Sequence, residues 1–150
     1  MFERILLAYD GSEPARAAAR LAFAIAEPGG ASVRIVHVLE GARGLPAHPE
    51  ALRDVERLRE EQRRDWEGEL SALGEEAPSG VRVDSAVLSG HPAECLLEAL
   101  RADAADLVVV GTHGVGGLKP LLGSVSHQLV EHAACPVLLV REDLPDGPDR

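Results

Sequence analysis

The sequence predicts an α/β fold: a single-domain, open, doubly wound parallel sheet of five strands with the strand order 3-2-1-4-5. Two observations predict this class. Short apolar runs alternate with longer amphipathic stretches along the chain, which is the pattern of repeated strand–helix units. The most continuous apolar run, residues 107–110, suits a strand that helices cover on both faces. Because crossovers between parallel strands are right-handed, such units place helices on both faces of one sheet.

The first strand–helix unit is expected at residues 5–9 and 13–26. Residues 5–9 are an apolar run, and the turn that follows them contains Ser12, which can cap the helix. The helix is rich in alanine, and the run Pro-Gly-Gly at residues 28–30 is expected to end it. The second strand is expected at residues 33–39, where His37 should pack against a helix or be capped by water.

A long charged helix is expected next, over residues 50–73. Its leucines, Val55 and Trp66 mark one apolar face, and its arginines and glutamates read as a solvated face. The remaining elements, in chain order, are a strand at 81–88, a helix ending near 101, a strand at 107–110, a glycine-rich segment at 111–123, a helix at Ser124–His132 and a strand at Val137–Val140. The domain is expected to span residues 1–143, with a flexible tail at 144–150.

The composition excludes several classes of partner. The 150 residues carry a formal net charge of −10, which disfavours nucleic acid and anionic membranes. The apolar runs are far shorter than a membrane span, and the amino-terminal residues do not resemble a signal peptide, so we expect a cytoplasmic protein. Cys95 and Cys135 form no CxxC pair and are expected to be small buried thiols in a reducing compartment.

Two loops at the carboxyl ends of neighbouring strands form a candidate anion site. One is the Asp10 turn, and the other is the glycine-rich segment that leads to Gly123 and a helix. The first N–H groups of a helix lack internal partners and carry partial positive charge, so they attract anions. The hydroxyls of Ser124 and Ser126 can add hydrogen bonds, and Lys119, the only lysine, can reach a terminal phosphate.

The alternative is a glycine-rich loop that only makes a tight turn, with Ser124 as a structural helix cap. Familiar nucleotide motifs do not decide the question. The chain has no Gly-x4-Gly-Lys-Ser/Thr loop and no complete Gly-x-Gly-x-x-Gly fingerprint. A phosphoacceptor receiver domain would need an aspartate at the end of the third strand, where this chain has Ser89.

Four segments resemble the universal stress protein family, and the similarity extends over nearly the whole chain. They read ILLAYDGS at residues 5–12, DLVVVGTHG at 106–114, GSVS at 123–126 and CPVLLV at 135–140. This resemblance implies a Rossmann-like sheet and, in its ATP-binding type, a Gly-x2-Gly-x9-Gly-Ser/Thr motif. Here Gly111 and Gly114 match, but only eight residues separate Gly114 from Gly123, and Pro120 lies among them. The phosphate loop is therefore one residue short.

The resemblance also implies roles for individual residues around bound ATP, possibly with Mg²⁺. Asp10 would face the ribose and any divalent ion, Ala8 would line the adenine pocket, and Val38 would meet adenine through its backbone. Gly111 and Gly114 would frame the ribose–phosphate turn, and His113 would hydrogen-bond the ligand or solvent. The phosphates would lie on Gly123, Ser124, Val125 and Ser126. The strand Val137–Val140 resembles the strand through which family dimers pair antiparallel.

Three functions remain open at this point. The leading hypothesis is a nucleotide-responsive stress or regulatory homodimer that binds ATP, acts on an unknown protein partner and is not an enzyme. The second is a family member that has lost nucleotide binding and works through protein contacts alone. The third is a slow Mg²⁺-dependent ATP hydrolase that uses His113 as a base, although no nucleophile or second acid is placed with it in the sequence. His127 and His132 lack metal-ligand spacing and are expected at the surface.

Overall fold

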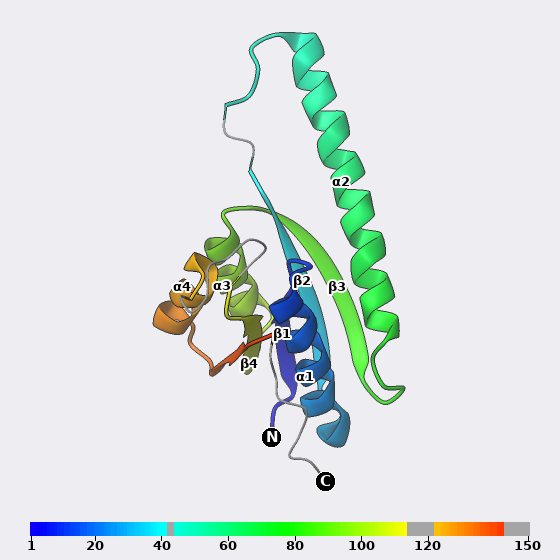
Figure 1. Cartoon of the computed structure of the whole chain (residues 1–150), viewed down its shortest axis with the longest axis vertical. Coiled ribbons are helices and arrows are strands. Elements are labelled where there is room, and N and C mark those ends of the chain that lie inside the picture. Colours follow the sequence, from blue (N-terminus) through cyan, green and yellow to red (C-terminus); the bar gives the residue numbers. More distant parts are fainter. Residues whose placement is uncertain (42–43, 114–121, 143–150) are drawn as a thin grey trace.

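The computed structural model describes residues 1–41, 44–113 and 122–142, so the predicted tail at 144–150 lies outside the described residues. The described residues form five strands and four helices that alternate along the chain (Figure 1). In order, they are β1 (Arg4–Ala8), α1 (Glu13–Gly29), β2 (Ser32–Glu40), α2 (Pro49–Glu75), β3 (Arg82–Gly90), α3 (Pro92–Ala102), β4 (Leu107–Gly111), α4 (Ser124–His132) and β5 (Val137–Val140).

The five strands form one parallel sheet in the order β3-β2-β1-β4-β5. This confirms the predicted fold class and strand order. The chain reverses its direction of travel across the sheet between β1 and β4, where Ile5 pairs with Leu107 and Leu7 with Val109. Ligands of open parallel sheets bind beyond the carboxyl ends of the strands at such a switch point. The Asp10 turn and the segment after Gly111 both leave the sheet at this point.

Helices cover both faces of the sheet and create two apolar cores. One core joins α1 and α2 to one face, with Leu7, Ile35 and Leu70 fully buried in it. The other core joins α3 and α4 to the opposite face, around Leu6 and Leu129. Because successive side chains of a strand point to opposite faces, each central strand contributes to both cores. Among the described residues, no helix has the length and apolarity needed to cross a membrane.

Alanine dominates the buried side of the helix α1. Ser12 caps it: the backbone N–H of Ala15 donates to Ser12 Oγ at 3.2 Å, as predicted. The run at residues 28–30 ends the helix as predicted, although α1 continues through Pro28 to Gly29, three residues past the predicted bound at residue 26. A proline in the last turn removes only one helical hydrogen bond, and Gly30, with φ 65°, then closes the helix by donating to the carbonyl oxygens of Ala26 and Glu27.

The helix α2 packs on the sheet only through its carboxyl half. Leu70 and Leu73 are buried, but Leu58, which was expected on the same apolar face, is 54% exposed. In Figure 1 the amino half of α2 extends well beyond the carboxyl ends of β2 and β3, where no strand remains to cover it. The amphipathic pattern of this helix therefore overstates its burial.

The two cysteines are free thiols and are only partly buried, so the expectation of full burial is wrong. Cys95 lies in the first turn of α3, where its Sγ donates to the carbonyl oxygen of Ser89 at 3.6 Å. Cys135 precedes the edge strand β5. Desolvation is still sufficient to raise the pKa of both thiols, which keeps them protonated near neutral pH.

Candidate functional site

A cleft of about 670 Å³ opens at the carboxyl edge of the sheet, at the switch point between β1 and β4. Nine of the eleven residues that the sequence placed in a binding site line this one cleft. They are Ala8, Asp10, Val38, Gly111, His113, Gly123, Ser124, Val125 and Ser126. The other two, Gly114 and Lys119, lie outside the described residues.

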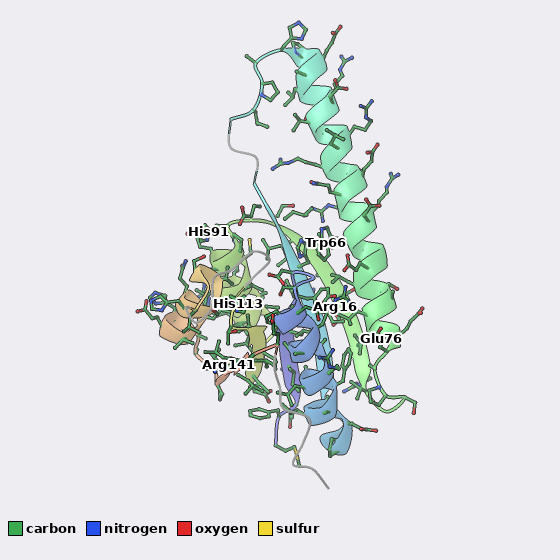
Figure 2. The ribbon with its side chains drawn as sticks, viewed as in Figure 1. Arg16, Trp66, Glu76, His91, His113 and Arg141 are labelled. Carbon is green, nitrogen blue, oxygen red and sulfur yellow. The ribbon has the colours of Figure 1, made fainter. Side chains whose placement is uncertain are left out.

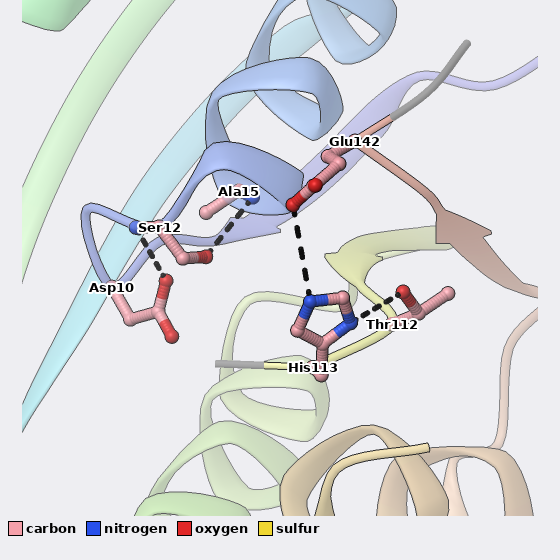
Figure 3. A network of polar contacts seen from close by, with 6 residues as sticks. All are labelled: Asp10, Ser12, Ala15, Thr112, His113 and Glu142. Carbon is pink, nitrogen blue, oxygen red and sulfur yellow. Dashed lines mark hydrogen bonds and ion pairs between the residues drawn. The ribbon is translucent and has the colours of Figure 1, made fainter. Parts of the chain in front are cut away.

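The turn after β1 holds Asp10 at the cleft wall. The backbone N–H of Ser12 donates to Asp10 Oδ1 at 3.0 Å, and the next hydrogen bond along the chain is the Ser12 cap of α1 (Figure 3). Gly11 between them adopts φ 82°, a conformation that side chains other than glycine rarely tolerate. The aspartate is therefore fixed by the start of the helix that follows it.

The opposite wall is the amino terminus of α4. Gly123 caps this helix with φ −66° and ψ 158°, and no side chain caps it. The expectation that Ser124 serves as the structural cap is therefore wrong. The backbone N–H groups at the start of an α-helix have no partner within the helix, so those of Ser124, Val125 and Ser126 are directed at whatever occupies the cleft.

The two serines of this helix end differ. Ser124 is exposed, and its hydroxyl has no capping bond. Ser126 is only 2% exposed, and its hydroxyl faces two carbonyl oxygens, that of Thr112 at 3.0 Å and that of Gly123 at 2.9 Å. The hydroxyl of Ser126 thus ties the start of α4 to the end of β4, and its backbone N–H is the group that remains for an anion.

His113 follows β4 and is held by the protein on both sides of its ring. Its Nδ1 lies 3.2 Å from Thr112 Oγ1, and its Nε2 lies 4.0 Å from Glu142 Oε2 (Figure 3). The side chain is 11% exposed. Thr112 and Glu142 belong to segments that leave the paired strands β4 and β5, so His113 fastens these two segments together at the floor of the cleft.

The lining of the cleft combines apolar and polar groups. Val36 and Val38 of β2, Leu96 of α3 and Val110 of β4 contribute apolar side chains that belong to one core cluster. Asp10, Gly123 and Ser124 contribute polar groups. No lysine or arginine lines the cleft among the described residues, so backbone amides and the α4 dipole supply its positive potential.

Three further lining residues were not predicted from the sequence: His37 and Glu40, which flank the predicted Val38 on β2, and Gln62 of α2. The prediction that His37 packs against a helix is confirmed, because its ring stacks on Trp66 of α2 with centroids 3.5 Å apart and planes 12° apart. Its Nδ1 lies 2.8 Å from the carbonyl oxygen of Tyr9, which accepts the hydrogen. Burial lowers the pKa of His37 below its ordinary value. The position of His37 one residue before Val38 was the available signal.

Comparison with known proteins agrees with this geometry. The chain is 44% identical over 146 residues to a universal stress protein of Thermus aquaticus, an alignment that covers 94% of this chain and all of the relative. The fold matches the universal stress protein UspA of Lactobacillus plantarum with a TM-score of 0.77 at 23% identity, covering 93% of this chain and 97% of that one. It also matches a universal stress protein solved in complex with cAMP, with a TM-score of 0.59 at 28% identity over 94% of this chain and 98% of that one.

The family assignment rests on almost the whole described chain. The model of the universal stress protein family matches residues 1–141, which include every strand and helix of the sheet and both walls of the cleft. The fold match to a solved family member and the sequence identity to a relative covered over its whole length point the same way. The chain belongs to the universal stress protein family.

Proposed function

We propose that this protein binds an adenine nucleotide, ATP in the first instance, in the cleft between Asp10 and the amino terminus of α4. One observation carries the proposal: the uncapped first turn of α4 and the fixed carboxylate of Asp10 line the same cleft, whose volume suits a small-molecule ligand. The complex of a family relative with cAMP supports the adenine class of ligand.

Each part of a nucleotide has a matching wall. The apolar lining residues Ala8, Val36 and Val38 suit an adenine ring. The backbone of Val38 would form hydrogen bonds with that ring. The carboxylate of Asp10 suits ribose hydroxyls, because a charged acceptor forms stronger hydrogen bonds than a neutral one. The amides of residues 124–126 suit phosphate oxygens. Gly111 and His113 complete the described lining. The family resemblance assigns Gly114 and Lys119, which lie outside the described residues, to the phosphates, and Mg²⁺ would be the counterion of those phosphates.

The protein is proposed to bind the nucleotide without turning it over. The low exposure of His113 supports this: its side chain is only 11% exposed, and its ring nitrogens lie beside protein oxygens, Thr112 Oγ1 at 3.2 Å and Glu142 Oε2 at 4.0 Å. Binding would instead alter a homodimer formed through β5, which lies at the edge of the sheet and leaves one side of its backbone without a strand partner among the described residues. The occupied dimer would then act on a protein partner as a stress or regulatory signal.

The test is calorimetric titration and thermal melting of the purified full chain with Mg-ATP, ADP, AMP and cAMP. A ligand at one hundred times its Kd stabilises the folded state by about 2.7 kcal/mol, which is a readily measured rise in Tm. Nucleotide released from freshly purified, denatured protein would identify the natural occupant. Absence of heat, of a Tm shift and of released nucleotide would instead favour a family member that works through protein contacts alone.

Two variants locate the site. Asp10→Asn keeps an oxygen that accepts from Ser12 N–H but removes the charge, so the affinity for nucleotide is expected to fall. Glu13→Gln removes the same charge from an exposed position three residues away and is expected to leave the affinity unchanged. Sustained phosphate release from ATP that His113→Ala abolishes would favour the hydrolase hypothesis over the binding one.

A further inference from the structure

Trp66 of α2 does not line the cleft, but it contacts the two strand ends that do. Its ring stacks on His37 at the end of β2, with centroids 3.5 Å apart. It meets Tyr9, directly after β1, edge to face at 6.4 Å and 77°. Figure 2 places Trp66 on the side of α2 that faces the sheet. One side chain therefore contacts residues near the carboxyl ends of both β1 and β2.

The turn that carries Asp10 also rests on this ring. A Cβ atom added to Gly11 would lie 3.3 Å from the Cη2 atom of Trp66, so the indole covers the open side of that glycine. Gly11 adopts φ 82° and stands between Asp10 and Ser12, the two residues joined by the hydrogen bond that fixes the aspartate. Trp66 thus packs against Gly11 of the turn, while the neighbouring Asp10 and Ser12 line the cleft.

His37 links the same ring to the cleft by a second route. The imidazole lines the cleft, and its Nδ1 donates to the carbonyl oxygen of Tyr9 at 2.8 Å. Stacking on the indole fixes the plane of the imidazole, and the hydrogen bond to Tyr9 fixes the orientation of the ring within that plane. A loss of the indole would release both the imidazole and the strand end that it holds.

The position of α2 is itself fixed one turn before Trp66. The guanidinium of Arg63 donates from Nη1 to the carbonyl oxygen of Val87 at 2.7 Å and from Nη2 to Ser89 Oγ at 2.8 Å. One turn after Trp66, Leu70 is fully buried. Gln62, which immediately precedes Arg63, lines the cleft. The middle of α2 is therefore seated against the site, although its amino half extends beyond the sheet.

We propose that Trp66 is a positioning residue for the cleft: by clamping His37 and the Tyr9–Gly11 turn, it couples the seating of α2 to the affinity of the site for its nucleotide. The proposal rests on the proposed function for its ligand, but the clamp itself does not. Coupling between two sites is reciprocal, so a nucleotide that gains affinity from a seated α2 must also hold α2 more firmly against the sheet. A partner that grips the projecting half of α2 would thereby sense whether the cleft is occupied.

The experiment compares three variants of the full chain. Trp66→Leu removes the ring, Trp66→Phe keeps a smaller one, and Leu70→Ala loosens the same helix one turn away without touching His37 or the Asp10 turn. Hydrogen–deuterium exchange of residues 9–12 reports the clamp with no ligand present, and calorimetry reports the affinity for Mg-ATP. Thermal melting checks that each variant is folded.

We expect residues 9–12 to exchange faster in Trp66→Leu than in Leu70→Ala. The affinity for Mg-ATP should fall roughly tenfold in Trp66→Leu, within the range typical of coupled sites. It should recover in Trp66→Phe and fall less in Leu70→Ala, which loosens α2 but keeps the contacts of the indole with His37 and the Asp10 turn. Trp66 is the only tryptophan, so its fluorescence should also change saturably when nucleotide is added to the wild-type protein.

Two results would overturn the proposal. One is equal protection of residues 9–12 in Trp66→Leu and Leu70→Ala, which would show that the ring does not hold the turn. The other is a loosened turn with equal affinity in both variants, which would show that the clamp does not set binding. Failure of the wild-type protein to bind any nucleotide would count against the proposed function alone, because the exchange comparison still decides whether Trp66 holds the turn.

Discussion

His37 Nδ1 lies 2.8 Å from the carbonyl oxygen of Tyr9, and this hydrogen bond continues the pairing of β1 and β2 past the point where β1 ends. The backbone N–H of Tyr9 donates to the carbonyl oxygen of Val36 at 2.9 Å, so both backbone polar groups of Tyr9, its N–H and its carbonyl, are hydrogen-bonded to β2. The imidazole N–H of His37 thus supplies the hydrogen bond to Tyr9 that a backbone N–H would supply in a longer strand pair. Its bond to Tyr9 makes the rim of the cleft part of the sheet rather than a free loop.

The stability of the fold should depend on the protonation of His37. Burial is the largest influence on this group and lowers its pKa, against smaller opposing effects of the Tyr9 carbonyl and the carboxylates of Asp10 and Glu69. The unfolded chain then binds the proton more readily than the folded one, so the free energy of unfolding falls as the pH drops below the ordinary histidine value of about 6.5. Urea titrations at pH 7.5 and pH 5.5, values chosen to bracket about 6.5, measure the difference.

A matched pair of variants assigns that pH dependence. His37→Asn keeps a donor near the Tyr9 carbonyl but cannot be protonated in this range, so the stability difference between the two pH values should shrink. His127→Asn removes a histidine from the exposed side of α4 and should leave the contribution of His37 in place. An unchanged pH dependence in His37→Asn would refute this assignment.

Gly111 should be intolerant of a methyl group for a reason unrelated to any ligand. A Cβ atom there would lie 2.7 Å from Cβ of Pro14 and 3.1 Å from the backbone nitrogen of Ala15. Gly111→Ala must therefore push α1 away from β4, which we expect to cost about 1–3 kcal/mol in the free energy of unfolding. Gly41→Ala, where a Cβ meets nothing within 4 Å, is the control. Equal stability of the two variants by urea denaturation would show that α1 can move freely.

The two serines at the start of α4 should separate stability from binding. Ser126→Ala removes a donor from the carbonyls of Thr112 and Gly123, each of which keeps a second donor, and should lower the free energy of unfolding by about 1 kcal/mol. Ser124→Ala removes an exposed hydroxyl without a capping bond and should leave stability unchanged while weakening nucleotide binding. The check is denaturation and calorimetry of both variants, and the opposite assignment of effects would contradict it.

The proposed dimer depends on the outward backbone of β5. The backbone N–H of Val108 donates to the carbonyl of Pro136, and that of Thr112 donates to the carbonyl of Val140, so by alternation the N–H of Leu139 points away from β4. Leu139→Pro removes this N–H at an edge position where proline is tolerated and should convert a dimer to a monomer. Leu139→Ala, which keeps the N–H, should stay dimeric. Light scattering measures the mass, and a dimer in both variants would place the interface elsewhere.

Local sequence patterns determined much of this protein. Strand and helix runs alternate along the chain with distinct hydrophobic periods, so all nine described elements and their order in the sheet could be predicted, with α4 and β5 correct to the residue. The chemistry of the two loops at the switch point placed nine predicted residues in one cleft, because parallel strands end at the same edge.

Other features were decided only by tertiary contacts. A proline in the last turn of α1 was tolerated because Gly30 closes the helix, and Leu58 on the apolar face of α2 stays exposed because α2 extends beyond the sheet there. The hydroxyl of Ser126 is turned inward by carbonyls from β4, and the stack of Trp66 on His37 joins residues 29 positions apart. Periodicity records which face of an element is apolar, but only the packing of one element on another decides how much of that face is covered and which polar groups meet there.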